Sequence, residues 1–465
     1  MLKVVVAALS VVSLLSACQS EQKKEAKAQS EKSGTNIALA KAGLSEKDVT
    51  DAYVYLMSRY FVIRQERLDV AEKNLGYNKI KYIPTGQTSA PNPNLDSTNV
   101  EAWIAVDEKT CQILNIPKIK GRYYTAQVMD EWAGIIANIN ERTLPQHPNG
   151  KFAFCLKEGP PTAKDMVRIN LPSNKAKLVA RIEGQDAEAV RLQKLFKLTR
   201  NTETDVEPAQ KIPMFANENL LQVEAFEYPI VETVLRSAPD SMKAAQDLQA
   251  KVRAVAQYAS QSDVNKKQID TLIEEKSVPQ FRRFVADIGV KNNGWSSTAP
   301  YKDGFGEDYW FRTATTFGTI WWNEAKEVVY FKAEKDRDDR VMNGTNTYLV
   351  HFDKGALPKD VSGGFWSLTI LGVPDSKVVT NAYKRYQLNS KSNLTYGRDG
   401  SLTLVVGDQP RINIPRTNWI PGPREKLFSM NLKIYAPKES VLNGTWTAPS
   451  IVQIEGLDIQ KTSQR

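Results

Sequence analysis

GRYYTAQVMDEWAG, residues 121–134, is the stretch that decides which kind of fold the sequence predicts. In an extended chain, successive side chains point to opposite faces, so the stretch divides into two sets. Arg122, Tyr124, Ala126, Val128, Asp130 and Trp132 share one face, and Tyr123, Thr125, Gln127, Met129 and Glu131 share the other. This pattern predicts a core strand, and any site in it draws on one set or the other.

The sequence on both sides of this stretch is also typical of β-sheet. Short alternating runs of apolar residues, broken by Pro, Gly and Asn, fill residues 82–156 and return after Tyr301. We expect strands at residues 102–106, 122–129, 152–156, 328–332, 347–352, 365–371, 402–406 and 427–435. Asn343-Gly344 and Asn443-Gly444 have the composition of tight turns. The chain is therefore predicted to be α+β, and mainly β.

Helical periodicity appears before and between these strand-rich regions. Residues 45–48, Ser-Glu-Lys-Asp, resemble a capping box and open a helix that can run to about Gly76. We expect further helices at residues 186–198, 242–259, 263–276 and 279–288. An N-terminal helix and a helical connector thus accompany the strands.

The N-terminus predicts export. Lys3 precedes an apolar run, residues 4–15, that is too short to span a bilayer, as in a secretory signal peptide. Leu15-Ser16-Ala17-Cys18 resembles the lipobox of bacterial lipoproteins, so Cys18 is the predicted lipidation site and residues 1–17 the signal peptide. Two or more acyl chains anchor a protein stably to a membrane. Gln19 and Ser20 follow the pattern that sorts such lipoproteins to the outer membrane.

Charge and cysteine content narrow the range of partners. The net charge is +9, but the 62 Lys and Arg residues are scattered among 53 Asp and Glu residues. An exported chain without a basic block is not expected to bind nucleic acid. Cys111 and Cys155 are able to form a disulfide in an oxidising compartment, and the sequence leaves open whether they do.

Several sequence blocks resemble one protein family. They include DAYVY at 51–55, NPNLDS at 92–97, the residues around 121–132, GFWSLT at 364–369, DGSL at 399–402 and NWIPGP at 418–423. Their order resembles bacterial proteins that pair two domains of unknown function, numbered 1254 (N-terminal) and 1214 (C-terminal). The chain departs from the family at Thr98 and Asn99, where the family usually has Leu-Tyr. An aromatic residue is therefore missing near Asp96.

The resemblance implies two antiparallel, jelly-roll-like β-sandwiches, and it leaves open whether the protein forms a homo-oligomer. Combined with the patterns above, it predicts five segments. These are a signal peptide at 1–17, a lipidated flexible tether at 18–44, a helix plus β-sandwich at 45–205, a helical connector at 206–300 and a C-terminal β-sandwich at 301–465. The resemblance does not imply an activity.

Residue types limit the chemistry that the chain can perform. The chain has two histidines, His147 and His351, so we expect no metal site, and no motif indicates a cofactor. A glycosidase-like mechanism needs two carboxylates, and Asp96, Asp130 and Glu131 are the candidate catalytic residues. The candidate binding residues are Arg122, Tyr124, Trp132 and Trp366.

Two functional hypotheses follow. The favoured one is a lipid-anchored binding or assembly module of the cell envelope, with the membrane and an envelope glycan or small ligand as partners. The alternative is a carboxylate-dependent hydrolase that acts on an envelope glycan or small ester. The sequence does not decide whether the protein is an enzyme.

Overall fold

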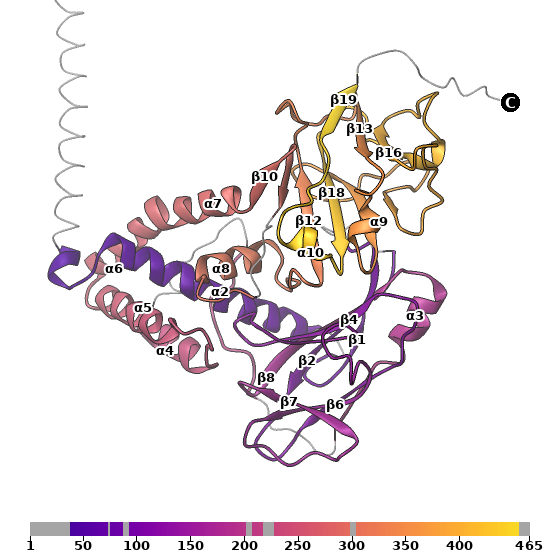
Figure 1. The fold of residues 1–465 in the computed structure, drawn as a ribbon. Helices are drawn as coiled ribbons and strands as arrows, with labels where there is room; N and C mark the ends of the chain where they lie inside the picture. The colour runs from indigo at the N-terminus through magenta and orange to yellow at the C-terminus, as the bar shows by residue number, and fades with distance from the viewer. Residues whose placement is uncertain are drawn as a thin grey trace, which may run out of the picture. The chain divides into compact units, whose positions relative to one another are not determined.

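The computed structural model describes residues 38–72, 75–86, 93–200, 207–216, 227–297 and 304–454 (Figure 1). The predicted signal peptide, Cys18 and residues 19–37 of the predicted tether lie outside these ranges. Within them, no helix combines the length and apolar character needed to cross a membrane. The chain divides into two compact units, Met1–Tyr60 with Gln210–Arg283, and Phe61–Ala209 with Phe284–Arg465.

The smaller unit is helical. Its elements are the first part of α2 (Glu46–Ala71), α4 (Tyr228–Arg236), α5 (Ala245–Ser260), α6 (Asp263–Leu272), a π-helical turn (Ile273–Ser277) and most of α7 (Val278–Asp287). The predicted capping box is present, because the Asp48 amide donates to Ser45 Oγ at 3.2 Å and Asp48 Oδ2 accepts from the Ser45 amide at 3.0 Å. Helix α2 ends at Ala71, before the predicted limit at Gly76.

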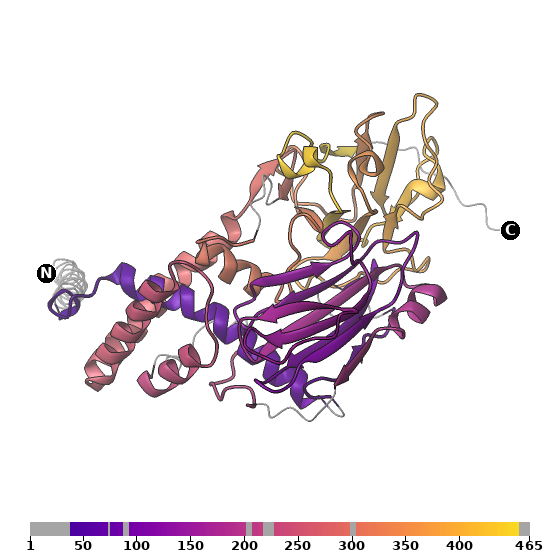
Figure 2. The ribbon, with the colours of Figure 1, turned by 60° about the horizontal axis from the view of Figure 1, so that its bottom comes forward.

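The first β-sandwich packs a five-stranded sheet, ordered β1-β2-β8-β4-β5, on a four-stranded sheet, ordered β7-β6-β3-β9. The strands are β1 (Lys81–Tyr82), β2 (Ser97–Ala105), β3 (Gln112–Ile116), β4 (Tyr124–Met129), β5 (Ile135–Ile139), β6 (Gly150–Leu156), β7 (Met166–Leu171), β8 (Lys175–Glu183) and β9 (Lys197–Arg200). Figure 2 shows these strands side by side in purple and magenta. All neighbours are antiparallel except β6 and β7.

The second β-sandwich packs a six-stranded sheet, ordered β10-β11-β12-β18-β14-β15, on a four-stranded sheet, ordered β17-β16-β13-β19. Its strands are β10 (Val290–Asn292), β11 (Trp295–Ser297), β12 (Val328–Ala333), β13 (Thr347–Phe352), β14 (Trp366–Gly372), β15 (Gln387–Asn389), β16 (Leu402–Gly407), β17 (Trp419–Pro421), β18 (Phe428–Tyr435) and β19 (Ile451–Ile454). Helices α8 (Tyr309–Gly318), α9 (Pro358–Val361) and α10 (Glu439–Leu442) and a 3₁₀ turn (Arg416–Asn418) accompany it. The mainly β prediction with two sandwiches is confirmed.

Two local predictions were wrong. The strand expected at 122–129 is present as β4 and ends at Met129 as predicted, but the shared strand face does not extend to Trp132, because residues 130–133 form a turn in which Ala133 has a φ of 64°. Asp130 and Trp132 therefore do not continue the strand face of Tyr124. The predicted helix at 186–198 divides into α3 (Ala187–Gln193) and strand β9, because the second part pairs with β3.

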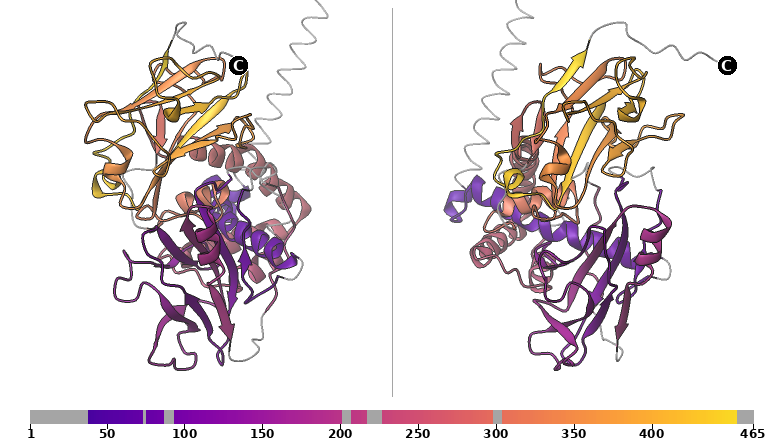
Figure 3. Two further views of the ribbon diagram at one scale, coloured as in Figure 1. Left: turned by 90° about the vertical axis from the view of Figure 1, so that its right-hand side faces the viewer. Right: turned by 45° about the vertical axis from the view of Figure 1, so that its right-hand side comes forward.

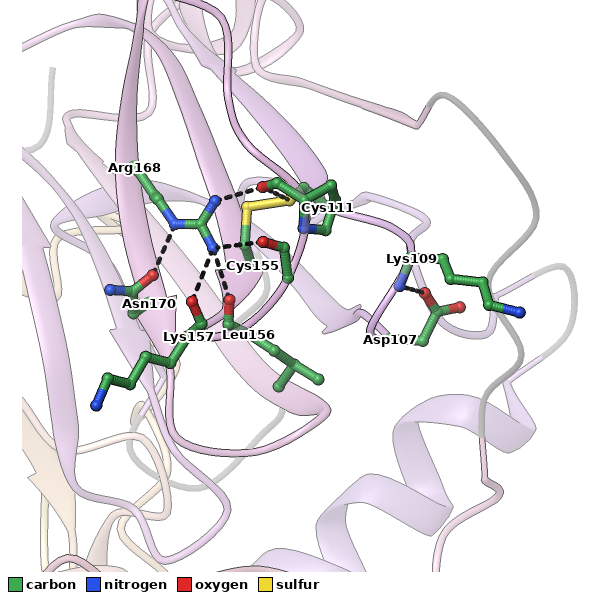
Figure 4. Close-up of a disulfide and its surroundings, with 10 residues drawn as sticks. Asp107, Lys109, Cys111, Cys155, Leu156, Lys157, Arg168 and Asn170 are labelled. Carbon is green, nitrogen blue, oxygen red and sulfur yellow. Dashed lines mark hydrogen bonds between the residues drawn. A yellow bond between two sulfur atoms is a disulfide. The ribbon is translucent and has the colours of Figure 1, made fainter.

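The structure joins Cys111 and Cys155 by a disulfide (Figure 4). The bond links the residue before β3 to strand β6, within the smaller sheet of the first sandwich. Arg168 lies beside it and donates to the carbonyl oxygens of Pro160 at 2.5 Å and of Leu156 at 2.7 Å. The disulfide thus links the two central strands of this sheet, and neither cysteine is among the residues that line the cleft described below.

Candidate functional site: a polar cleft between the two sandwiches

The large sheet of the first sandwich has a polar outer face. Along β8, the sequence KAKLVARIE alternates, so that Leu178 and Ile182 enter the core while Lys177 and Arg181 point outward. Strand β2 is in register, placing Asn99 opposite Arg181 and Glu101 opposite Val179. The outer face of this five-stranded sheet therefore carries charged and amide side chains.

The large sheet of the second sandwich also turns a polar face outward. Tyr330 of β12 is opposite Lys433 of β18, and Lys332 is opposite Asn431. On the other side of β18, Ser367 and Thr369 of β14 continue the same two rows. Figure 3 shows the two sandwiches, purple to magenta and orange to yellow, as neighbours within the larger unit.

A cleft of about 480 Å³ lies between these two faces. Asn94, Asn99, Glu101 and Arg181 line it from the first sandwich, and Tyr330, Lys332, Thr369, Asn431 and Lys433 from the second. Residues 319–323, which follow α8, contribute Trp321 and Asn323. The volume is in the range of small-molecule sites in proteins, which is roughly 300–1,000 Å³.

Arg181 lines the cleft, and its described side-chain hydrogen-bond partners are neutral. Its side chain donates to Gln127 Oε1 at 2.9 Å and to the Trp321 carbonyl oxygen at 2.9 Å, both neutral acceptors. The residue is 8% exposed and forms no ion pair with any described residue. Burying a charge without a counter-charge is unfavourable, so this arrangement calls for an explanation.

The other cations around the cleft do have carboxylate partners. Lys177 Nζ lies 2.9 Å from Glu101 Oε2 and 2.7 Å from Asp69 Oδ2. Lys332 Nζ lies 2.7 Å from Glu334 Oε1 at the surface. Both lysines therefore have a carboxylate counter-charge nearby. Arg181 differs from them, because its described partners are neutral.

Neutral polar groups of the cleft are arranged in two clusters. Asn94 Nδ2 donates to Ser97 Oγ at 2.7 Å and to Asn99 Oδ1 at 2.9 Å. On the other wall, Asn323 Nδ2 donates to Tyr330 Oη at 2.5 Å. Asn323 Oδ1 is buried and accepts from no described residue. The cleft therefore contains hydrogen-bonding capacity that the described chain does not use.

Asp96 lies beside the cleft and joins the two sandwiches. Its Oδ2 atom accepts from Lys433 Nζ at 2.7 Å and from Tyr435 Oη at 2.9 Å. Its Oδ1 atom is buried with no partner among the described residues. Asp96 also lines a second cavity of about 320 Å³, together with Phe365 and Lys391.

The charge state of these partners follows from their surroundings. Burial by itself lowers the pKa of the Lys433 ammonium, but the charge and hydrogen bond of Asp96 outweigh it and hold that pKa above the ordinary value. Burial, followed by the Asp96 charge, raises the pKa of Tyr435 well above its usual value. At neutral pH, Lys433 is charged and Tyr435 is a neutral donor.

Glu327 forms a second carboxylate cluster between the sandwiches. Its Oε2 atom accepts from Tyr123 Oη at 2.7 Å and from Arg142 Nη2 at 2.5 Å. Its Oε1 atom accepts from Asn140 Nδ2 at 2.9 Å. Both oxygens are thus satisfied. The rings of Tyr123 and Tyr435 contact each other at a centroid distance of 5.4 Å, so the two clusters adjoin.

Sequence comparison identifies the two sandwiches. A family described as "Protein of unknown function (DUF1254)" matches residues 77–200, and "Protein of unknown function (DUF1214)" matches residues 327–439. The protein belongs to the proteins that pair an N-terminal DUF1254 domain with a C-terminal DUF1214 domain. No activity is assigned to either domain. No curated protein matches the chain.

Two solved structures resemble the paired DUF1254 and DUF1214 chain. The VPA0106 protein from Vibrio parahaemolyticus is 18% identical, with a TM-score of 0.65, over 88% of this chain and 100% of that one. An uncharacterised protein from Burkholderia cenocepacia is 11% identical, with a TM-score of 0.42, over 90% and 96%. The similarity to the Vibrio parahaemolyticus protein supports the assignment of the fold and nothing further.

The three candidate acids of the DUF1254 domain have separate environments. Asp96 lies at the sandwich contact described above. Asp130 Oδ1 accepts from the backbone amides of Trp132 at 2.8 Å and Gly134 at 2.7 Å, so this carboxylate stabilises a turn. Glu131 is buried, with Oε1 at 3.8 Å from Lys175 Nζ. The structure does not bring the three together around one cavity.

The predicted binding residues are placed as follows. Arg122 does not meet Asp130, because β4 ends between them; it pairs with Asp186 at 2.7 Å. Tyr124 Oη donates to the Pro148 carbonyl oxygen at 2.8 Å, while its ring lies in the core of the DUF1254 sandwich. Trp132 is buried under the Arg312 guanidinium, and Trp366 lies in the core of the DUF1214 sandwich.

The sequence analysis missed the residues that line the cleft most directly. Arg181, Lys433 and Asn323 were not among the candidates. The alternation of KAKLVARIE, with cations at every second or fourth position, was the available signal for a strand with a polar outer face. One departure from the family pattern, at Asn99, does lie in the cleft, because Asn99 lines it opposite Arg181 in the sheet.

Proposed function

We propose that the protein is a lipid-anchored module of the cell envelope that binds a small polar ligand in the cleft between its DUF1254 and DUF1214 domains. One observation carries the binding part of this proposal. Polar groups from both sandwiches converge on the cleft, and the buried Asn323 Oδ1 atom has no partner among the described residues. A ligand hydroxyl or amide is the kind of group that satisfies such an acceptor.

The aromatic lining supports the same proposal. Trp321 lines the cleft, and its ring is fixed by edge-on contact with Trp103 at a centroid distance of 5.7 Å. Lys177 Nζ lies 4.9 Å from the centroid of the Trp321 ring. A rigid ring beside hydrogen-bonding groups suits a ligand with both apolar and polar faces, such as a sugar or a sugar derivative.

The sequence of the N-terminus supports the envelope part of the proposal. The apolar run at residues 4–15 and the lipobox-like residues 15–18 make Cys18 the attachment point of the lipid. The Lys-, Glu- and Ser-rich residues after Cys18 have the composition of a flexible tether. With Gln19 and Ser20 after the cysteine, the outer membrane is the proposed location.

The hydrolase hypothesis is less well supported. A two-carboxylate mechanism needs two acids that face one cavity at a suitable separation. Glu101 lines the cleft, but Lys177 binds it, and Asp130 is occupied by backbone amides. Binding therefore accounts for the cleft better than acid–base catalysis does.

The binding proposal is tested by filling the cleft. Wild-type protein and the variant Asn431→Trp are screened by thermal shift against envelope glycan fragments, sugar acids and polyols. A ligand at about 100 times its Kd stabilises a protein by about 2.7 kcal/mol, which raises its melting temperature measurably. We expect at least one compound to stabilise the wild type, and Asn431→Trp to lose that response.

The control for this screen is a variant that introduces a tryptophan outside the cleft. Asn115 is exposed on strand β3 of the other sheet of the DUF1254 sandwich, so Asn115→Trp keeps the cleft open. This variant is expected to respond like the wild type. The binding proposal fails if no compound class stabilises the wild type, or if Asn431→Trp responds as strongly as Asn115→Trp.

The anchor is tested separately in cells. The variant Cys18→Ser removes the thiol that carries the lipid, so we expect the protein to move from the membrane fraction to the soluble fraction. Membrane fractionation followed by immunoblotting measures the distribution. Continued membrane association of Cys18→Ser would overturn the lipoprotein assignment and would leave the binding proposal intact.

A further inference from the structure

We infer that the ligand of the cleft carries a carboxylate or phosphate group that binds Arg181, and hydroxyl groups that bind the amide side chains around it. This inference rests on the proposed binding function and names the ligand class, a small hydroxylated organic anion. The inference follows from the charged groups and the hydrogen-bonding groups that line the cleft.

The first step is the uncompensated charge. Arginine remains charged at every physiological pH, so burial cannot be relieved by loss of a proton. Arg181 is 8% exposed, and its two described partners, the Gln127 amide and the Trp321 carbonyl, supply dipoles and no net charge. Glu101 is the carboxylate in the cleft lining, and it binds Lys177 at 2.9 Å. A ligand anion supplies the missing counter-charge.

The second step is orientation. A guanidinium has five N–H donors in a planar fork, and the Gln127 and Trp321 oxygens fix the plane by accepting from Nη1 and Nη2, respectively. These two acceptors lie on different parts of the chain, so the fork is held before any ligand arrives. The remaining N–H groups are able to donate to a carboxylate or phosphate without a change of rotamer.

The third step concerns the rest of the ligand. Asn99 lies opposite Arg181 in the sheet register, and across the cleft the Asn323 Oδ1 atom needs a donor. An anionic oxygen cannot satisfy an acceptor, whereas a hydroxyl donates to one acceptor and accepts from another group. The cleft therefore fits an anion that also bears hydroxyl groups better than it fits a simple inorganic anion.

The experiment compares matched probes by isothermal titration calorimetry on the full mature chain. Galacturonate and galactose share one ring and differ at the carboxylate, and inorganic phosphate provides the anion without hydroxyls. We expect the wild type to bind galacturonate at least about tenfold more tightly than galactose, the size of effect that a charge-assisted hydrogen bond provides. Stronger binding of phosphate than of galacturonate would show that a phosphate is the recognised group and would overturn the hydroxyl part of the inference.

Variants assign the effect to Arg181. Arg181→Gln is expected to reduce galacturonate affinity at least about tenfold and to leave galactose affinity unchanged, while Arg181→Lys retains part of the preference. Arg191→Gln is the matched control, because Arg191 is an exposed arginine on α3 that pairs with Glu188. This control is expected to bind both sugars like the wild type.

The outcomes separate the inference from the proposed function. If galactose binds the wild type as tightly as galacturonate, the anion inference is wrong and the binding function stands. If the wild type binds no probe in the calorimeter and no compound in the thermal-shift screen, both are wrong. The wild-type comparison needs no variant, so it decides the question even if Arg181→Gln fails to fold.

Discussion

Glu327 and Asp96 are two buried carboxylates with nearly the same surroundings. Each is bound by one cation and one tyrosine from the other sandwich, Arg142 with Tyr123 for Glu327 and Lys433 with Tyr435 for Asp96. The tyrosine rings touch, so the two clusters are neighbours. Together they join the DUF1254 and DUF1214 sandwiches by reciprocal ion pairs.

The two clusters differ in how completely each carboxylate is used. Both oxygens of Glu327 accept hydrogen bonds, including one from Asn140 Nδ2 at 2.9 Å. Asp96 has both donors on one oxygen, and the other oxygen is buried without a described partner, at the wall of a cavity of about 320 Å³. We interpret Glu327 as a structural connection, and Asp96 as a connection that also borders a space for other molecules.

The largest expected effect comes from breaking the complete cluster. Glu327→Ala leaves Arg142 and Tyr123 without their shared acceptor, and removing one partner of a buried ion pair destabilises a protein by about 3–5 kcal/mol. Urea denaturation followed by tryptophan fluorescence measures the change. Glu188→Ala, which breaks an exposed pair with Arg191, is the control and is expected to lower the stability much less than Glu327→Ala does. Equal losses in the two variants would show that the Glu327 cluster is not a structural connection.

A smaller effect with a distinctive pH dependence is expected at the incomplete cluster. Asp96→Asn keeps the shape of the side chain but removes the charge that holds the pKa of Lys433 above 10.5. We expect a loss of about 1–3 kcal/mol, and less than at Glu327→Ala, because the amide oxygen of Asn still accepts hydrogen bonds from Lys433 and Tyr435 whereas Ala removes every acceptor.

The direction of the pH dependence tests the cause. In the wild type, the raised pKa of Lys433 contributes stability below pH 10.5, and this is lost as the pH rises through the folded-state value. In Asp96→Asn, burial remains and lowers the pKa of Lys433, so the variant should lose stability relative to the wild type as the pH falls toward neutrality. Parallel stability curves for the two proteins between pH 8 and pH 11 would contradict this account.

The same two clusters show what the sequence could predict and what it could not. Alternation placed strand β13 at residues 347–352 and gave nearly correct bounds for β12, β16 and β18, because strand periodicity is a local property. The partners of Asp96 are 337 and 339 residues away in the chain, and Tyr123 is 204 residues from Glu327. No local pattern encodes such pairings, so Asp96 was identified as a candidate without its partners.

Strand ends explain the wrong expectation for the opening stretch of sequence. Arg122 and Asp130 have the spacing of one strand face, but the chain turns after Met129, where Asp130 binds the amides of Trp132 and Gly134. Gly134 fits this turn closely, since a Cβ there would lie 2.6 Å from Asp130 Oδ2. Arg122 is then left to pair with Asp186, a residue that α3 presents as its N-cap.

Asp186 is a third carboxylate bound by a cation, and unlike Glu327 and Asp96 it lies at the surface. The hydrogen bond from Arg122 is the largest cause that lowers the pKa of Asp186 from 3.8 to about 2; burial opposes it, and the Ala189 amide lowers the pKa further. A lowered pKa contributes stability above pH 3.8 that is lost as the pH falls toward 2. Because 46% of the Asp186 side chain is exposed, solvent screening limits this contribution to about 1 kcal/mol or less.

Asp186→Asn should therefore be less stable than the wild type at pH 6 by this small amount, and the difference should vanish near pH 2. Urea denaturation at both pH values measures it, and a difference at pH 6 as large as that of Glu327→Ala would show that exposure does not separate the three carboxylates.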